Sequence, residues 1–293
     1  MSNRKSVAMF WVMVAVPAIL GWRAIAAVLS LAWSDEAYTH ILLILPISIG
    51  LMYLDWPNKR TEPRPSWLHG GALLALAMAA AVIAKFNSPF SPDLQLSLYT
   101  LALILGWIGA FVGCFGIRLS QTFLFPLCFL FWLVPFPAVL LKAIVVGLQQ
   151  GSASAAHLLF VAAGVPAVQD GIVLTIPGLT VEVAQECSSI RSSMMLLITT
   201  MVLAQLLLRS PWRKALADVL VIPLSLAKNG LRIFTIAMLG TRVDPAYLTG
   251  RLHHEGGVIF LIVALAAIFL LLWFLRDDNP AQQLVAPDAA AHK

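Results

Sequence analysis

Long apolar runs alternate with short polar breaks along almost the whole chain. A membrane-spanning helix needs about 20 predominantly apolar residues, and eight segments are apolar enough to be interpreted as spans. We expect these spans near 7–31, 38–54, 67–84, 96–117, 121–134, 188–208, 214–240 and 254–275. The pattern predicts an all-α polytopic membrane protein with about eight transmembrane helices.

Residues 135–186 fit this pattern least well. The run there is apolar, but Pro135, Lys142 and the cluster Gln149-Gln150-Gly151 interrupt it. Further on, β-branched residues alternate around Pro177-Gly178, which is typical of a short hairpin. We expect a small extracytoplasmic cap over 135–186, with interfacial helices and a short β-like patch. Two further spans in this region would preserve the topology, so ten spans are an alternative to eight.

Composition supports the membrane class. The chain is 60% hydrophobic and only 11% charged, with a mean hydropathy of +0.89, whereas soluble domains contain about 25% charged residues. The first apolar run lacks a convincing small-residue cleavage site, so we interpret it as a retained span. We expect one integral membrane domain over 1–275, in which the helices of 187–275 follow the irregular segment 135–186. Residues 276–293 are polar and rich in Ala and Pro, which predicts a disordered cytoplasmic tail.

Charges at the breaks predict the orientation. Basic residues gather at alternate breaks: Arg4, Lys5, Lys59, Arg60, Arg64, Arg118, Arg209, Arg213, Lys214 and Arg276. Acidic residues gather at the others: Asp35, Glu36, Asp93, Asp170, Glu182 and Glu186. Lys and Arg collect on the cytoplasmic side of bacterial membranes, so we expect a multi-pass inner-membrane protein with both termini cytoplasmic. The net charge of +5 then indicates contact with anionic lipids, not with nucleic acid.

This topology brings three chemically distinct side chains to the extracytoplasmic side. Cys187 precedes the span that ends near Arg209, roughly 33 Å away at about 1.5 Å per helical residue. Arg232 lies roughly 27 Å above Lys214 on the same count, and His253 immediately precedes the last span. Three separate helices are therefore expected to present a thiol, a guanidinium and an imidazole on one side of the membrane.

Such a trio is suited to acyl transfer. A thiolate is the nucleophile, and a cationic neighbour or a helix N-terminus favours it. Histidine can protonate a leaving amine, and arginine can stabilise an oxyanion. From the residues alone, other roles stay open: Cys187 as a packed side chain, Arg232 reaching lipid headgroups or pairing with Glu186, and His253 as a solvated interfacial group. An intramembrane arginine nevertheless favours function.

Four stretches resemble motifs of the exosortase/archaeosortase family of polytopic membrane cysteine transpeptidases. They are AWSDEAYTHILLILPISIGL, GIVLTIPGLTVEVAQECSSIRSS, KNGLRIF and LHHEGGVIF. The second is similar to A-C-S-G-[I/L]-[R/K]-S, which implies Cys187 as the nucleophile. The third is similar to N-x-[I/L]-R-[I/V], which implies Arg232 as the transition-state stabiliser. The fourth is similar to H-x-x-x-G-x-x-F, which implies His253 as the general acid and base, with His254 as the alternative.

The resemblance covers about 33–275 and carries specific functional expectations. It implies cleavage of a C-terminal sorting signal of the PEP-CTERM kind, which is a short motif followed by an apolar helix and a basic end. The reaction would pass through a thioester, and an unknown acceptor nucleophile at the cell surface would receive the exported protein. It also implies a possible link to exopolysaccharide. The chemistry requires no cofactor and no metal ion.

The chain departs from the family pattern at several positions. Ser189 stands where the family usually has glycine, and Glu186 stands where a small residue is common. Both flank Cys187, so they bear on the recognition motif. Thr39 replaces the usual serine before His40.

Five further residues are candidates for supporting roles. Arg191 lies four positions after Cys187 and could support the thiolate or bind lipid phosphate. Asn229 lies three positions before Arg232 and could orient it, or could simply join helices. His40, near the outer end of its span, could line the same cavity. The remaining two candidates, Glu186 and Ser188, flank the thiol.

Three other classes of protein are alternatives to this interpretation. A transporter or lipid flippase could use an anion path made of Lys142, Arg191, Lys228 and Arg232, and this is the main alternative. A zinc protease of the H-E-x-x-H type is rejected, because Val258 stands at the second histidine position. A serine protease built on Ser152 lacks any motif that links this serine to a histidine.

Overall fold

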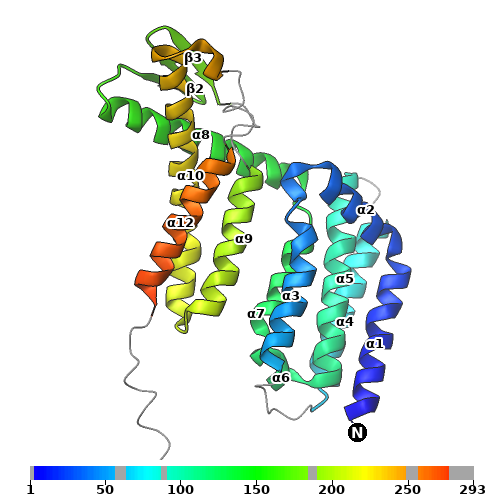
Figure 1. The fold of residues 1–293 in the computed structure, drawn as a ribbon. Helices are drawn as coiled ribbons and strands as arrows, with labels where there is room; N and C mark the ends of the chain where they lie inside the picture. Colours follow the sequence, from blue (N-terminus) through cyan, green and yellow to red (C-terminus); the bar gives the residue numbers. More distant parts are fainter. Residues whose placement is uncertain (1–2, 57–63, 87–90, 184–189, 249–256, 277–293) are drawn as a thin grey trace, which may run out of the picture. The chain divides into compact units, whose positions relative to one another are not determined.

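The computed structural model describes most of the chain. The described residues are 3–56, 64–86, 91–183, 190–248 and 257–276. Helices predominate, and the sheet is small, with three strands. The chain divides into two compact units, Met1–Val146 and Gly147–Lys293 (Figure 1). The expected all-α membrane architecture is confirmed.

Seven described helices are long and apolar enough to cross a membrane, and the number is eight when one bent pair counts as a span. This range agrees with the expected count of about eight. The bent pair is Ser6–Leu20 with Trp22–Ser34, and the seven are Glu36–Asp55, Trp67–Phe86, Pro92–Phe115, Ala138–Ala162, Ile190–Leu207, Pro211–Arg242 and Gly257–Leu275.

The first unit is a helical bundle around α5. Its elements are α1 (Asn3–Leu20), α2 (Trp22–Ser34), η1 (Glu36–Tyr38), α3 (Ile41–Asp55), α4 (Trp67–Phe86), α5 (Pro92–Phe115), α6 (Ile117–Thr122), α7 (Leu124–Phe129), η3 (Leu130–Leu133) and the first part of α8 (Ala138–Ala162). In α5, 67% of the apolar window is buried, more than in any other candidate span of the described residues. Helix α5 is therefore the core helix of this unit.

Glycines allow α4 and α5 to approach closely. A Cβ added at Gly70 of α4 would lie 2.5 Å from the Gly113 Cα, and Gly109 faces the same contact. Gly109 and Gly113 form a G-x-x-x-G spacing, which lets helix backbones pack together where lipid supplies no hydrophobic driving force. The small residues of these two spans thus fix their pairing.

The first expected span is not one straight helix. The segment predicted as 7–31 is divided at Gly21 into α1 and α2, which meet at a bend of 73°. Glycine has a low helix propensity and Pro17 lies one turn before it, so the break falls where the helix is intrinsically weakest.

The segment predicted as a span at 121–134 is also broken. It contains α7 and η3, and the apolar helix Leu124–Leu133 is too short to cross alone: about 15 Å at about 1.5 Å per residue. Gly116 follows the end of α5, and the Pro135 carbonyl accepts a 2.8 Å hydrogen bond from Ser97 Oγ near the start of α5. Together with α6, the segment between these two points therefore runs back along α5. The segment consists of short helical pieces and not of one continuous helix.

The two described cysteines differ in exposure. Cys114 is buried in α5, but Cys128 on α7 is exposed. Leu124 and Phe131 are exposed beside it in sequence. This surface is apolar, so lipid can cover the thiol.

The second unit combines a helix trio with a small sheet. Its elements are the rest of α8, β1 (Val168–Asp170), β2 (Val173–Ile176), β3 (Leu179–Glu182), α9 (Ile190–Leu207), α10 (Pro211–Arg242), η5 (Pro245–Leu248) and α12 (Gly257–Leu275). Buried aliphatic residues such as Leu196, Val221 and Ile268 join α9, α10 and α12. Helix boundaries match the spans expected at 188–208, 214–240 and 254–275 to within a few residues.

The sheet confirms the predicted β-like patch and adds a strand. Strands β2 and β3 pair in antiparallel register around the Pro177-Gly178 turn, with Ile176 opposite Leu179. Gly178 has φ +81°, a value that glycine adopts without strain. Strand β1 pairs with the other edge of β2, so the order is β1-β2-β3.

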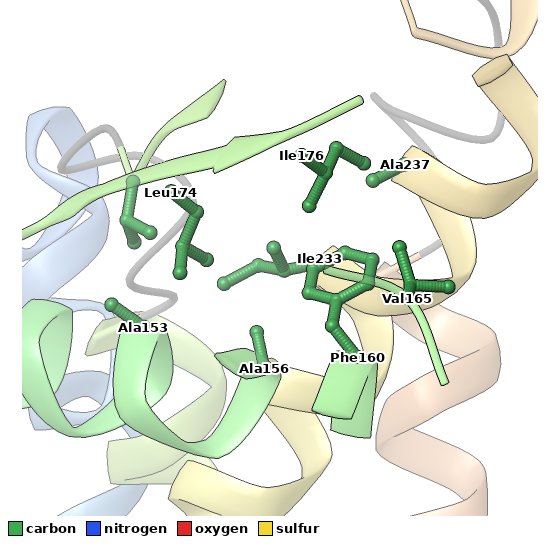
Figure 2. Close-up of a cluster of buried hydrophobic side chains, with 9 residues drawn as sticks. Ala153, Ala156, Phe160, Val165, Leu174, Ile176, Ile233 and Ala237 are labelled. Atoms are coloured by element: carbon green, nitrogen blue, oxygen red, sulfur yellow. The ribbon is translucent and has the colours of Figure 1, made fainter. Parts of the chain in front are cut away.

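The sheet packs on helices of the same unit through one apolar cluster. Figure 2 shows side chains of β2 directed toward α8 and α10. The labelled members are Ala153, Ala156, Phe160, Val165, Leu174, Ile176, Ile233 and Ala237. The cluster fixes the sheet against the half of α10 that contains Arg232. The cap predicted for 135–186 stays a prediction.

Candidate functional site

Arg232 lies on α10 close to the beginning of α12. The residue is half-buried, and a Cβ added at Gly257 would lie 3.8 Å from Arg232 Nη1. Gly257 is the first residue of α12. The guanidinium and the N-terminal end of the last span are therefore neighbours, as the topology predicted from the sequence requires.

The first turn of α9 lies beside the adjacent turn of α10. The buried Lys228 donates a hydrogen bond from Nζ to Ser192 Oγ, and the Ser193 and Ser225 hydroxyls lie 2.6 Å apart. Ser192 is the third residue of α9, and Lys228 lies one helical turn before Arg232. Polar contacts thus hold the start of α9 at the level of the Arg232 turn.

Together these contacts place the start of α9, the Arg232 turn and the start of α12 at one end of the helix trio. Arg191, a predicted supporting residue, lies in the first turn of α9 and is exposed. Several predicted site residues lie outside the described residues: Glu186, Cys187, Ser188, His253 and His254. Their roles stay predictions.

Asn229 joins α10 to α8 in the interior. Its side chain is 1% exposed, and Nδ2 donates a 2.9 Å hydrogen bond to Ser152 Oγ, while Oδ1 has no hydrogen-bond partner among the residues that the structure describes. Next to it, a Cβ added at Gly230 would lie 2.6 Å from the Ala155 Cβ. The helices touch at this point, so Asn229 anchors the turn that precedes Arg232. Because Ser152 is buried in this contact, its hydroxyl is also ill placed to serve as a protease nucleophile.

Sequence reasoning missed the function of the polar residues in α8. The sequence predicts an interruption at Gln149, yet α8 runs unbroken through Gln149 and Ser152, and its full length is 25 residues. Gln149 Nε2 donates a 2.7 Å hydrogen bond to the Val183 carbonyl, so it ties α8 to the end of β3. The two residues are three apart and share one helix face, a spacing that indicates a buried polar face.

A groove of about 260 Å³ opens beside Arg232. One wall is β3 with Val183, and the other is α10 with Ile233, Ile236 and Ala237; Leu248 of η5 completes it. Most of these side chains are apolar. Arg232 supplies the guanidinium of the lining, so the groove leads to the candidate catalytic arginine.

His40 lies in the first unit, at the start of α3. It is 2% exposed, Nδ1 is 3.1 Å from the Ala37 carbonyl, and its ring meets Trp132 edge to face at 6.4 Å. These contacts are all within the first unit, and its supporting role stays a prediction. Among the described residues, no three His, Cys, Asp or Glu side chains are grouped to hold a metal ion.

Comparison with protein families identifies a match over most of the chain. The family model described as transmembrane exosortase matches residues 32–270. No curated protein and no solved structure matches the chain. The matched range covers most of the chain and includes the described helices α3 to α10 and most of α12. The chain belongs to the transmembrane exosortase family.

Proposed function

We propose that this protein is a membrane cysteine protease and transpeptidase that removes a C-terminal sorting signal from exported proteins. Membership of the exosortase family supports a transpeptidase-like role in the membrane in general terms. The substrate is proposed to be a protein with a PEP-CTERM-like tail, namely a short motif, an apolar helix and a basic end. The released protein is joined to a surface acceptor, with a link to exopolysaccharide assembly.

The proposed reaction has two acyl-transfer steps. The Cys187 thiolate attacks the scissile carbonyl carbon and forms a C–S bond, while Arg232 donates hydrogen bonds to the oxyanion. His253 gives a proton to the leaving amine as the C–N bond breaks, which leaves a thioester on Cys187. An acceptor amine, hydroxyl or water, deprotonated by the histidine, then attacks the thioester and releases the thiolate.

The observation that carries this proposal is the meeting of three helices around Arg232. Cys187 is three residues from Ile190, and three residues span at most about 11 Å. His253 is four residues from Gly257, a reach of at most about 14 Å. Because Arg232 Nη1 is near Gly257 and the start of α9 is held at the Lys228 turn, both side chains have the reach to meet the guanidinium.

The natural reporter for this function is an exported protein that carries a candidate tail. We expect co-expression with this protein to shorten the reporter by the length of the tail, because the apolar helix of the tail delivers the scissile bond to the membrane surface. Immunoblotting of cell fractions measures the change. A tail without its short motif is the control, and an unprocessed reporter across all candidate tails from the same genome would refute the proposal.

We also propose that the site faces the periplasm. The charges at the breaks support this orientation, and α8 is the least apolar of the seven candidate spans, with a mean hydropathy of 1.3 against 1.5 to 3.2 for the others. Helix α8 is therefore proposed to lie at the outer interface below the sheet, which leaves the start of α9 outside.

Cysteine labelling tests this orientation. In a chain whose native cysteines are replaced, we expect Val168→Cys on β1 to react with a membrane-impermeant maleimide in intact cells. Ser210→Cys, between α9 and α10, should react only after permeabilisation, because its neighbours Arg209 and Arg213 mark the cytoplasmic side. The reverse pattern would place the active site in the cytoplasm.

A further inference from the structure

Strand β3 presents its free edge to the groove beside Arg232. It is an edge strand of the sheet, since the order is β1-β2-β3. Residues 179 to 183 all line the groove without a gap. Successive side chains of a strand point to opposite faces, so a surface that touches every residue in turn lies along the backbone edge.

The register identifies which backbone groups point into the groove. The Val183 N–H donates to the Ile172 carbonyl at 3.0 Å, toward β2. In an antiparallel pair the bonded positions alternate, so Val181 and Leu179 also bond to β2. The N–H and C=O groups of Thr180 and Glu182 therefore point away from β2. Among the described residues, no other element donates to or accepts from these groups.

An edge of this kind is a template for a partner with its own backbone donors and acceptors, because its outward N–H and C=O groups have no strand beside them among the described residues. A lipid acyl chain could fill the groove but could not pair with them. An extended peptide has backbone N–H and C=O groups at the spacing of the strand, so it can pair with this edge along its whole length.

We propose that β3 binds the sorting signal as an added β-strand, through the extended segment that precedes the apolar helix. This inference rests on the proposed function and names how its substrate is held. The backbone of the signal pairs with Thr180 and Glu182, and alternate side chains enter the groove against Ile233 and Ile236. This pairing aligns the scissile carbonyl with Arg232, because both walls of the groove lead to that side chain.

Site-specific photo-crosslinking tests the inference directly. A photoreactive amino acid replaces Thr180, whose side chain is exposed, in the Cys187→Ala chain, which cannot turn the substrate over. Co-expressed with the tail-bearing reporter and irradiated, this chain is expected to form an adduct with the reporter. The matched control carries the same amino acid at Val168 on β1, the opposite edge of the sheet, and should form none.

A proline scan of the reporter supplies an independent readout. Proline is introduced at each position of the segment before the apolar helix, one position at a time. We expect processing to fall at every second position, because proline removes the N–H only where the signal donates to β3. A uniform response, or one that does not alternate, would contradict strand addition.

The outcomes separate this inference from the proposed function. If the wild-type chain leaves every reporter intact, the proposed function fails and the inference fails with it. If the reporter is processed but Thr180 crosslinks only within its own chain or to a second copy, strand addition is wrong and the protease assignment stands. An adduct with the reporter together with an alternating proline response supports strand addition.

Discussion

Replacement of Cys187 by alanine is expected to abolish processing of the tail-bearing reporter. The thiolate forms the covalent bond in the proposed first step, and the alanine side chain has no nucleophilic atom that could replace it. Loss of a catalytic nucleophile lowers kcat by about 10⁶-fold in a well-studied serine protease, so we expect at least about 10³-fold here. The measurement is the fraction of reporter shortened over time, compared at equal levels of membrane-inserted protein.

The controls for this variant use the other two thiols. Cys114→Ala and Cys128→Ala should leave processing unchanged, since these residues lie in the first unit on α5 and α7. In the wild-type chain, a reporter fragment linked to Cys187 should be released by hydroxylamine, which cleaves thioesters. Full processing by Cys187→Ala would favour the transporter or flippase alternative, which depends on the basic residues and tolerates loss of the thiol.

The long helices could be predicted because membrane crossing imposes a strong requirement on composition. Helix α9 occupies Ile190–Leu207 where the sequence predicted 188–208, and α12 begins within three residues of its predicted start. The hairpin at Pro177-Gly178 was likewise predictable, since proline followed by glycine suits a turn with positive φ at its second central residue. Both the long helices and the turn depend on residues that are close together in the sequence.

Other features depend on tertiary contacts that a single sequence does not reveal. The sequence predicts that Gln149 interrupts the apolar run. Its side-chain amide donates a hydrogen bond to the Val183 carbonyl, so α8 continues through this position. The bend at Gly21 and the division of the segment after Gly116 into short helices also escaped prediction, because an apolar run has the same pattern whether its helix is continuous or broken. The approach of Ser192 to Lys228 required the packing of α9 against α10.

The candidate site was predictable in outline. Alternating charges located the ends of the spans, and helical rise then brought Arg232 to the level where the last span begins. The structure agrees at the described residues, because Arg232 Nη1 lies near Gly257. The groove along β3 was not predictable, since it forms only where α10 supplies the wall opposite the strand.

Replacement of Arg232 by alanine is expected to lower the rate of processing by about 10²–10³-fold, the usual effect of losing one oxyanion donor. The reason is that the guanidinium keeps its positive charge throughout the reaction and donates hydrogen bonds to the oxyanion from N–H groups held in a fixed plane. Arg232→Lys keeps the positive charge but loses the planar set of N–H donors, so we expect its cleavage rate to lie between those of Arg232→Ala and the wild-type chain. Single-turnover rates of reporter cleavage measure both variants.

Two further measurements separate a catalytic role for Arg232 from a structural one. Arg242→Ala, at the exposed end of the same helix, is the matched control and should cleave the reporter at the wild-type rate. The photoreactive Thr180 chain should still crosslink the reporter when Arg232 is alanine, because strand addition uses the backbone of β3 and not the guanidinium.

If Arg232→Ala instead removes the crosslink while the protein remains inserted and equally stable to heat, the guanidinium binds the sorting signal in the ground state. In that case the oxyanion role assigned to it is wrong, since a group that acts only in the transition state lowers the rate without weakening binding.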